Sequence, residues 1–491
     1  MVKIYINNST CQLKDVPKEA EQALREALKY QNQSVAYKYH QNLKDIAKLW
    51  SMVESRSFSS NRVSLIKRAK ALEYQNEGML KNLYKILYQD GTFPTGLLPK
   101  ALQILKDCNL TFEIKDERKK PQLETIKYVL REQFPQLRYY QRASSRLAKE
   151  NGRGIIVAPT GTGKTLTVAR MIWELGLKTV VITPSKSITD NMVDTLRKYF
   201  GKGKVDKLNT KTPKLKKDIN VVNIQAMVRI KPEVFNDVDM VIIDEFHHSA
   251  AETYQEVNLN HLKNCYYRIG VTATNFRNDG SDLALEGVLS EVLYEYSIPR
   301  AIKDGFLIRP TFEIVENDIY VPEEERSTYQ AEYKSCIVHN ENRNQLIADI
   351  AHELLKENAS IIILVQQLEH GESLKTLIPE AKFLHGEEKD SVRQQIMEDY
   401  RQGQIRCLIG TSVIGEGVDL PIANTLILAG GGKSRIQVMQ NIGRVLRPFK
   451  DKTQALVIDF TDDGTSYSSK HHLERCSIYD IYDEVEEDAE V

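Results

Sequence analysis

The sequence predicts an α/β protein in which two tandem parallel-sheet domains follow a small α+β domain. From residue 121 to about residue 307, short apolar runs typical of buried strands alternate with helix-like stretches, and the alternation returns after Arg309-Pro310. A length of 491 residues leaves room for two to four domains with complete cores. We therefore expect four parts: a small basic α+β domain over residues 1–118, a first α/β domain over 119–307, a second over 308–466, and a C-terminal tail with an acidic end over 467–491.

The front domain is predicted from scattered local signals. Val2–Ile6 alternates between apolar and polar residues like a short strand, and Asp15 is expected to cap a helix that Pro17 opens. The remaining expected elements are a strand at Leu83–Tyr88, a helix at Leu98–Lys106, a strand at Thr111–Ile114 and a charged linker at Lys115–Pro121.

The second α/β domain is predicted from apolar runs of strand length. Its expected strands are Ile361–Val365, Lys382–Leu384, Cys407–Ile409, Thr425–Leu428 and Ala455–Ile458.

A glycine loop is the strongest chemical signal in the chain. The segment Ala158-Pro159-Thr160-Gly161-Thr162-Gly163-Lys164-Thr165 follows the apolar run Gly154–Val157 and precedes a helix-like stretch. Glycines let backbone N–H groups turn toward phosphate oxygens, the lysine reaches the β- and γ-phosphates, and the threonine hydroxyl can bind Mg²⁺. The generic pattern opens with glycine, where this chain has alanine. We expect ATP or GTP here; the alternative is a glycine loop that binds nothing.

A second segment predicts the hydrolytic chemistry. The apolar run Asp239–Ile243 reads as a buried strand that ends at Asp244-Glu245-Phe246-His247. In open α/β sheets, ligands bind beyond the carboxyl ends of strands. Asp244 is placed to hold Mg²⁺, and Glu245 to orient and deprotonate a water molecule. Two solvated acids after a strand remain the alternative.

The third signal is a pair of arginines late in the chain. If Gln440–Pro448 is helical, Gln440, Arg444 and Arg447 fall on one face. Permanently charged guanidinium groups suit the charge that develops on a phosphoryl group. Surface arginines are the alternative interpretation.

Composition restricts the class of protein. The six cysteines are scattered singly, which argues against a zinc site or a disulfide framework and fits a reducing compartment. No apolar run reaches membrane-spanning length, so we expect no membrane partner. The net charge of zero divides into +8 over residues 1–120, +7 over 121–310 and −15 over the remainder. A basic front half suits a polyanionic partner.

Together these segments resemble the superfamily 2 helicases and DNA translocases of the DExH type, whose fold contains two RecA-like domains. The resemblance runs from about Leu137 to Thr461, two-thirds of the chain. In chain order, the segments similar to the family's motifs are Leu137–Gln141, Ala158–Thr165, Thr183-Pro184, Asn223-Ile224-Gln225, Asp244–His247, Gly270–Thr274, Gly410–Asp419 and Gln440–Arg447.

The resemblance implies a role for each matching residue. Arg444 and Arg447 would act on ATP from the second domain, with Lys164, Asp244 and Glu245 as the other catalytic residues. His247, Thr272 and Thr274 would couple the nucleotide state to domain closure. Thr183, Gln225 and Thr411 would contact the sugar-phosphate track. Mg²⁺ would be held by Thr165 and Asp244, and the nucleotide by Gln141, Thr160, Gly161, Thr162, Gly163, Lys164, Thr165, Gly417, Asp419 and Gln440.

Within the family, the resemblance favours DNA over RNA. Thr272-Ala273-Thr274, with Phe276-Arg277 and Asp279-Gly280 after it, looks like the XPB, UvsW and restriction-translocase branch. Residues 1–114 more loosely resemble the small domain that precedes the motor in UvsW-type phage helicases. Asn191 and Thr274 depart from residues common in the family, and Asn191 puts the nearby strand contact in doubt.

The implied activity is an ATP-dependent DNA helicase or branch-migrating translocase. It would act on forks and junctions in replication, recombination or repair, moving 3′ to 5′ in a bacterial or phage-infected cytoplasm. Two alternatives remain open: an RNA helicase, and a non-unwinding DNA translocase module of a nuclease complex. The front domain would contact DNA or only stabilise the motor.

Overall fold

The computed structural model describes most of the chain. The described residues are 1–54, 60–129, 134–211, 213–246, 251–274, 282–317, 320, 322, 328–411, 414, 420–450, 452–464 and 466–484. By its internal contacts the chain divides into unit 1, comprising Met1–Ile156 and Thr167–Tyr294, and unit 2, comprising Val157–Leu166 and Glu295–Val491. None of the described helices is both long enough and apolar enough to cross a membrane.

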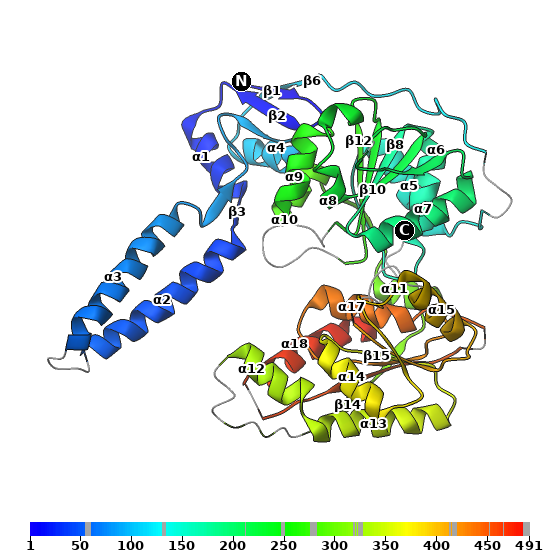
Figure 1. The fold of residues 1–491 in the computed structure, drawn as a ribbon. Helices are drawn as coiled ribbons and strands as arrows, with labels where there is room; N and C mark the ends of the chain where they lie inside the picture. The colour runs from blue at the N-terminus through cyan, green and yellow to red at the C-terminus, as the bar shows by residue number, and fades with distance from the viewer. Residues whose placement is uncertain are drawn as a thin grey trace. The chain divides into compact units, whose positions relative to one another are not determined.

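Unit 1 opens with a four-stranded sheet (Figure 1). Its order is β5-β2-β1-β6, with β1 (Val2–Ile6) antiparallel to β2 (Thr10–Lys14) and parallel to β6 (Phe112–Asp116); β5 is Thr92–Pro94. Helices α1 (Lys18–Ala27) and α4 (Leu98–Asp107), with the short helix η1 (Thr95–Leu97), bury their apolar faces against the sheet. The result is the small α+β fold that the sequence predicts.

Three local predictions in the front domain need correction. The backbone of Asp15 is left-handed (φ +60°), and Pro17 rather than Asp15 occupies the N-cap of α1, without a side-chain cap. The strand expected at Leu83–Tyr88 is shorter, since β4 spans Tyr84–Ile86. The first residues of the expected linker belong to β6, because Lys115 and Asp116 pair with Tyr5 and Ile6.

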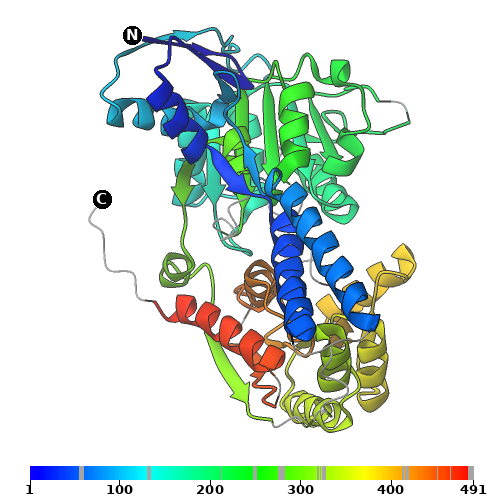
Figure 2. The same cartoon turned by 90° about the vertical axis from the view of Figure 1, so that its left-hand side faces the viewer.

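A helical hairpin interrupts this domain. β4 pairs antiparallel with β3 (Lys29–Gln31), and between them run α2 (Gln33–Glu54) and α3 (Ser60–Leu80). Figures 1 and 2 show the two helices side by side, projecting from the rest of unit 1. Neither α2 nor α3 was predicted.

The first α/β domain is a seven-stranded sheet of order β13-β7-β12-β11-β8-β10-β9. The ladders that join β9, β10, β8, β11 and β12 are parallel, and the buried strands β8, β10 and β11 are mostly apolar. The strands are β7 (Arg153–Val157), β8 (Thr179–Thr183), β9 (Val205–Lys207), β10 (Ile219–Asn223), β11 (Met240–Asp244), β12 (Tyr267–Thr272) and β13 (Val292–Glu295). The helices are α5 (Tyr139–Asn151), α6 (Lys164–Leu175), α7 (Lys186–Phe200), α8 (Ile224–Met227), η2 (Pro232–Phe235), α9 (Ala251–Asn260) and α10 (Asp282–Leu289).

Two buried arginines join the front sheet to this domain. Arg153, at the start of β7, donates hydrogen bonds to the carbonyls of Asn8 and Val288. Arg268 of β12 is fully buried, and its Nη2 donates to Ser9 Oγ (3.1 Å). Burial lowers the pKa of Arg268 to about 10 and that of Arg153 well below its usual range. The turn between β1 and β2 of the front domain is therefore fixed at the amino-terminal ends of β7 and β12.

Unit 2 contains the second α/β domain, a six-stranded sheet of order β14-β19-β18-β15-β17-β16 whose ladders are all parallel. All five predicted strands are present, within two residues at each end, together with β14, which was not predicted. The strands are β14 (Pro310–Val315), β15 (Ile361–Leu364), β16 (Lys382–Leu384), β17 (Cys407–Gly410), β18 (Thr425–Ile427) and β19 (Ala455–Phe460). The helices are α11 (Ile298–Lys303), α12 (Tyr329–Tyr333), the π-helix η5 (Lys334–Val338), α13 (Glu341–Lys356), α14 (Leu368–Leu377), α15 (Asp390–Arg401), α17 (Arg435–Val445) and α18 (Ser466–Asp483).

The predicted C-terminal tail is mostly a packed helix. In α18, Arg475, Ile478 and Tyr482 are at most 1% exposed. Arg475 Nε donates to Asp459 Oδ2 (2.8 Å), so this helix is tied to β19. The acidic end beyond Glu484 lies outside the described residues. The fold class is confirmed: two parallel-sheet α/β domains follow a small α+β domain.

Candidate nucleotide site

The glycine loop has the backbone that phosphate binding requires. It follows β7, and Lys164 is the first residue of α6. Gly161 and Gly163 have φ values of +90° and +89°, a region that side chains with a Cβ rarely adopt. Buried Thr162 donates its hydroxyl to the Pro159 carbonyl (2.7 Å), which fixes the turn between the glycines. Successive N–H groups in such a turn, next to a helix N-terminus, suit phosphate oxygens.

The flanking loop residues are open enough to meet a ligand. Thr160, Lys164 and Thr165 are half-buried and Gly163 is exposed. The loop therefore fits a nucleotide in both shape and donor chemistry.

Asp244 and Glu245 stand at the carboxyl end of β11, in the same sheet as β7 and with β12 between them. Asp244 ends the strand and is 7% exposed. Glu245 is a non-glycine residue with φ +45°, a costly conformation that recurs at functional sites. Its N–H donates to the Val271 carbonyl (2.9 Å), which anchors the turn to β12.

The side chain of Glu245 is held by the predicted coupling segment. Its Oε2 accepts hydrogen bonds from the Ala273 N–H (3.2 Å) and from the Thr272 hydroxyl (3.4 Å). Thr272 in turn lies 3.4 Å from both the N–H and the carbonyl of Thr274. Two segments predicted separately are thus joined through one carboxylate. The buried Thr274 hydroxyl has no hydrogen-bond partner among the described residues.

The arginine prediction is partly corrected. Gln440 and Arg444 lie one turn apart on α17 and are 8% and 7% exposed. The helix ends at Val445, so Arg447 follows it rather than sharing its face. Within unit 2, a Cβ built on Gly161 would lie 3.0 Å from Cγ of Arg447. The side chain of Arg447 therefore lies against the glycine loop of its own unit.

Lys452 is a further cation close to Arg447. Its ammonium donates to the carbonyls of Ala423 (2.5 Å) and Pro421 (3.3 Å). Burial first, and then the charge of Arg447, lower the pKa of Lys452 to about 8. No sequence signal singled this residue out.

Gln141 lies in the first turn of α5 and is 1% exposed. Its Oε1 accepts from the N–H of Arg138 (2.9 Å), which closes the turn before the helix. The carboxamide thus shapes the segment from which a base contact would come. His247, Gly417 and Asp419, predicted for coupling and for the ribose side, lie outside the described residues.

The three predicted strand contacts differ in exposure. Gln225 is exposed on α8, whose N-cap Asn223 accepts from the Ala226 N–H (2.8 Å). Thr183 is fully buried at the end of β8, and its hydroxyl lies 2.6 Å from that of Thr189. The strand contact expected at this position stays a prediction.

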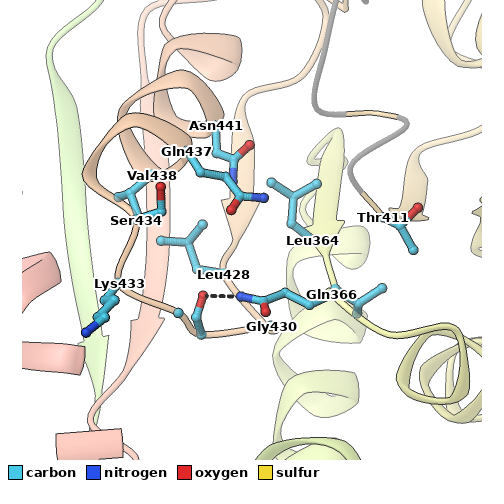
Figure 3. A pocket seen from close by; sticks show the side chains of 13 residues that line it. Leu364, Gln366, Thr411, Leu428, Gly430, Lys433, Ser434, Gln437, Val438 and Asn441 are labelled. Atoms are coloured by element: carbon cyan, nitrogen blue, oxygen red, sulfur yellow. Dashed lines mark hydrogen bonds between the residues drawn. The ribbon is translucent and has the colours of Figure 1, made fainter. Parts of the chain in front are cut away.

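Thr411 lines a solvent-open pocket at the carboxyl edge of the second sheet (Figure 3). Figure 3 shows Gln437 and Asn441 of α17 on the same pocket as Thr411, with Gln366 donating to the Gly431 carbonyl (3.2 Å). The run Gly430–Ser434 after β18 was the sequence signal for this pocket, and the motif analysis missed it.

Side chains of neighbouring helices donate hydrogen bonds to backbone carbonyls in and next to the run Gly430–Ser434. Arg343 Nη1 donates to the Ala429 carbonyl (2.8 Å), the Tyr333 hydroxyl to Gly430 (2.8 Å) and Arg475 Nη1 to Gly432 (2.8 Å). The segment that leads into α17 is therefore fixed by helices on its far side.

Comparison with known proteins gives two family matches in the expected order. Residues 119–277 match the model described as type III restriction enzyme, res subunit, and residues 343–448 match the helicase conserved C-terminal domain.

Individual relatives share about a quarter of their residues with this chain. The DNA 3′-5′ translocase XPB2 of Sulfurisphaera tokodaii is 24% identical over 393 residues, which cover 70% of this chain and 85% of that protein. The ATP-dependent DNA helicase uvsW of Enterobacteria phage T4 is 26% identical over 350 residues, which cover 66% and 68%.

A solved fragment assigned to an HsdR subunit of a type I restriction enzyme from Vibrio vulnificus shares the fold. It has a TM-score of 0.53 at 20% identity, with 79% of this chain and 73% of that chain covered. The two α/β domains are RecA-like, and the chain belongs to the superfamily 2 helicases, with relatives of the UvsW and XPB kind.

Proposed function

We propose that this protein is an ATP-dependent DNA helicase or translocase that unwinds or branch-migrates forked and junction DNA in replication, recombination or repair. The names of its UvsW and XPB2 relatives support DNA as the track. The basic front half of the chain, +8 over residues 1–120 and +7 over residues 121–310, supports a polyanionic partner.

The observation that carries the proposal is the pair of hydrogen bonds to Glu245. A motor must link hydrolysis to movement, and the carboxylate that would activate water is bound by Thr272 and Ala273, the segment expected to sense the nucleotide. Loss of the γ-phosphate would change the position of the Glu245 carboxylate, and these two hydrogen bonds would transmit that movement to β12. A nucleotide-binding protein without a motor function would not need this link.

The described residues support specific roles toward ATP. The N–H groups of the loop at Gly161 and Gly163 would receive the phosphates, and the Lys164 ammonium would bind their outer oxygens. Thr165 and Asp244 would hold Mg²⁺, which when bound neutralises phosphate charge and orients the oxygens. Glu245 would accept the proton of the attacking water. Arg444 and Arg447 would stabilise the charge that develops on the transferred group.

The first test is ATP hydrolysis by the purified chain with single-stranded DNA, duplex DNA, a four-way junction and RNA of matched length. Strongest stimulation by the junction supports the proposal. Preference for RNA would replace DNA by RNA as the track and leave the ATP site intact. Stimulation by DNA without displacement of a labelled strand from a forked duplex would favour the non-unwinding translocase.

Site variants test the chemistry separately. Lys164→Ala and Glu245→Gln should abolish hydrolysis while DNA binding is retained, and native hydrolysis by either would refute the assignment. Arg444→Ala should bind ATP nearly normally and turn over slowly. Equal loss of binding and turnover would argue against a role in the transition state.

A further inference from the structure

The last helix of the described chain, α18, surrounds one buried carboxylate with polar side chains. Asp459 of β19 is 1% exposed, and its Oδ2 accepts hydrogen bonds from Arg475 Nε (2.8 Å) and from the Tyr479 hydroxyl (2.7 Å). Nδ1 of His472 lies 3.4 Å from the same oxygen. These contacts would serve only to attach α18 to β19 if Arg475 had no further partner.

Arg475 also reaches the glycine run that leads into α17. Its Nη1 donates to the Gly432 carbonyl (2.8 Å), while its Nη2 donates to the Phe460 carbonyl (3.2 Å). Gly432 has a φ of +93°, which glycine adopts without strain, and α17 begins three residues later at Arg435. Among the described side chains that donate to carbonyls of this run, Arg475 therefore binds nearest to the start of α17.

The other end of α17 lies against the phosphate loop, and both belong to unit 2. A Cβ built on Gly443 would lie 2.8 Å from the Cβ of Thr160, so the helix backbone approaches the loop too closely for a Cβ. The next residue is Arg444, nine residues, or about 14 Å, along the helix from Arg435. Because α17 is a continuous helix, displacing its start displaces Arg444 relative to the loop as well.

We propose that Arg475 is a positioning residue for ATP turnover: by holding Gly432 it fixes the start of α17, and so the place of Arg444 at the phosphate loop. None of the hydrogen bonds that Arg475 makes within the described chain goes to that loop, so its effect has to pass through α17. Misplacing a catalytic group by about 1 Å lowers a rate by up to roughly 100-fold. The inference rests on the proposed function, because it takes ATP hydrolysis as the reaction and Arg444 as a residue that acts in it.

A purely structural role for Arg475 is the competing interpretation. In that case the position of α17 is set by its own buried apolar side chains, which are Val438, Ile442 and Val445. A guanidinium that served only a carboxylate would pair with both of its oxygens, as Arg343 does with Asp462. Arg475 instead leaves Asp459 Oδ1 without a hydrogen-bond partner among the described residues and directs Nη1 to Gly432. This geometry favours a role at the glycine run.

The test measures steady-state ATP hydrolysis by the full chain with saturating DNA, and ATP affinity separately. Arg475→Lys keeps a cation beside Asp459, but one ammonium does not reproduce the fork that spans Asp459 and Gly432, so kcat should fall about tenfold or more at native ATP affinity. Gly432→Ala leaves the Arg475–Asp459 pair in place, strains the run at φ +93° and should lower kcat in the same way. Tyr479→Phe is the matched control: it removes one hydrogen bond to the same carboxylate, so it should lower the midpoint of thermal unfolding and keep native kcat.

A double-mutant cycle with Arg444→Ala separates positioning from general damage. If Arg475 acts through Arg444, Arg475→Lys should lower kcat less than about twofold further in the Arg444→Ala background; losses that multiply overturn the positioning role. The same cycle with Gly432→Ala decides the question if Arg475→Lys does not fold. Native turnover by either variant overturns the role, and so does an equal loss of kcat in Tyr479→Phe, because the cause would then be weaker attachment of α18. A wild-type chain that does not hydrolyse ATP overturns the proposed function itself.

Discussion

Replacing Thr272 by valine should slow ATP turnover without weakening ATP binding. Valine keeps the shape of this 2% exposed side chain and removes only the hydroxyl that donates to Glu245 Oε2. A hydrogen bond to an ionised acceptor contributes about 1.5–3 kcal/mol. At 3.4 Å this one is longer than a typical O–H···O bond, so we take the lower end, about 1.5 kcal/mol.

If that free energy holds Glu245 in its productive orientation, its loss lowers kcat about tenfold. The assay is steady-state ATP hydrolysis with saturating DNA, with ATP affinity measured separately. Thr179→Val is the matched control, because Thr179 is a fully buried threonine at the start of β8 whose hydroxyl donates to the Leu177 carbonyl (2.9 Å). Native turnover by Thr272→Val, or an equal loss in Thr179→Val, would refute the link between the two segments.

Three further predictions concern stability. Arg343→Met should lower the free energy of unfolding in urea by about 3–5 kcal/mol, because Arg343 and Asp462 are 1% and 2% exposed and form a bidentate pair (2.7 and 3.1 Å); adding Asp462→Asn should recover part of the loss, and additive losses would contradict the pairing. Burial, followed by the charges of Arg343 and His339, lowers the pKa of His370 from 6.5 to about 3. His370 stays neutral in the folded chain while the unfolded chain takes up a proton, so stability present above pH 6.5 is lost as the pH falls toward 3. Thermal unfolding at pH 7 and 4.5 should show this loss, and His370→Gln should reduce it. Gly96→Ala should cost about 1–3 kcal/mol, because its Cβ would lie 2.0 Å from the Glu286 carbonyl oxygen, whereas Gly78→Ala in α3 meets nothing within 4 Å and should stabilise by about 0.5–1 kcal/mol; similar effects on the midpoint of thermal unfolding would contradict both.

The sequence predicted best where a strand is buried on both faces. Ile361–Leu364 is an uninterrupted apolar run, and so is Met240–Ile243 of β11, so the positions of both strands could be predicted to within a residue. The glycine loop could be predicted equally well, because its two left-handed glycines and its lysine all suit phosphate binding.

The helical hairpin was missed because its seam is narrow. A pair of helices that bury one side against each other needs few apolar residues, and Asn42, Asn76 and Trp50 occupy seam positions where a core pattern would show aliphatic side chains. Exposed Tyr37 and Tyr74 further blur the contrast between the two faces.

The surroundings of Thr183 and Arg447 could not be predicted for a common reason. A motif gives the order of residues but not their burial, and the Thr183 hydroxyl contacts that of Thr189 inside the fold. The helical face drawn through Arg447 failed because α17 ends two residues earlier. The link from Glu245 to Ala273 is made through a backbone N–H, which no side-chain pattern encodes.

The buried arginines under the front sheet bear on how the motor can be dissected. Arg153 and Arg268 donate to Asn8 and Ser9 in the turn between β1 and β2, and they lie near the starts of the strands whose far ends carry the glycine loop and Thr272. A fragment that began at residue 119 would lose these acceptors and expose apolar surface around two guanidinium groups. If such a truncation were inactive, the cause would be damage to the first α/β domain itself. The role of the front domain therefore has to be tested by point substitutions in the intact chain.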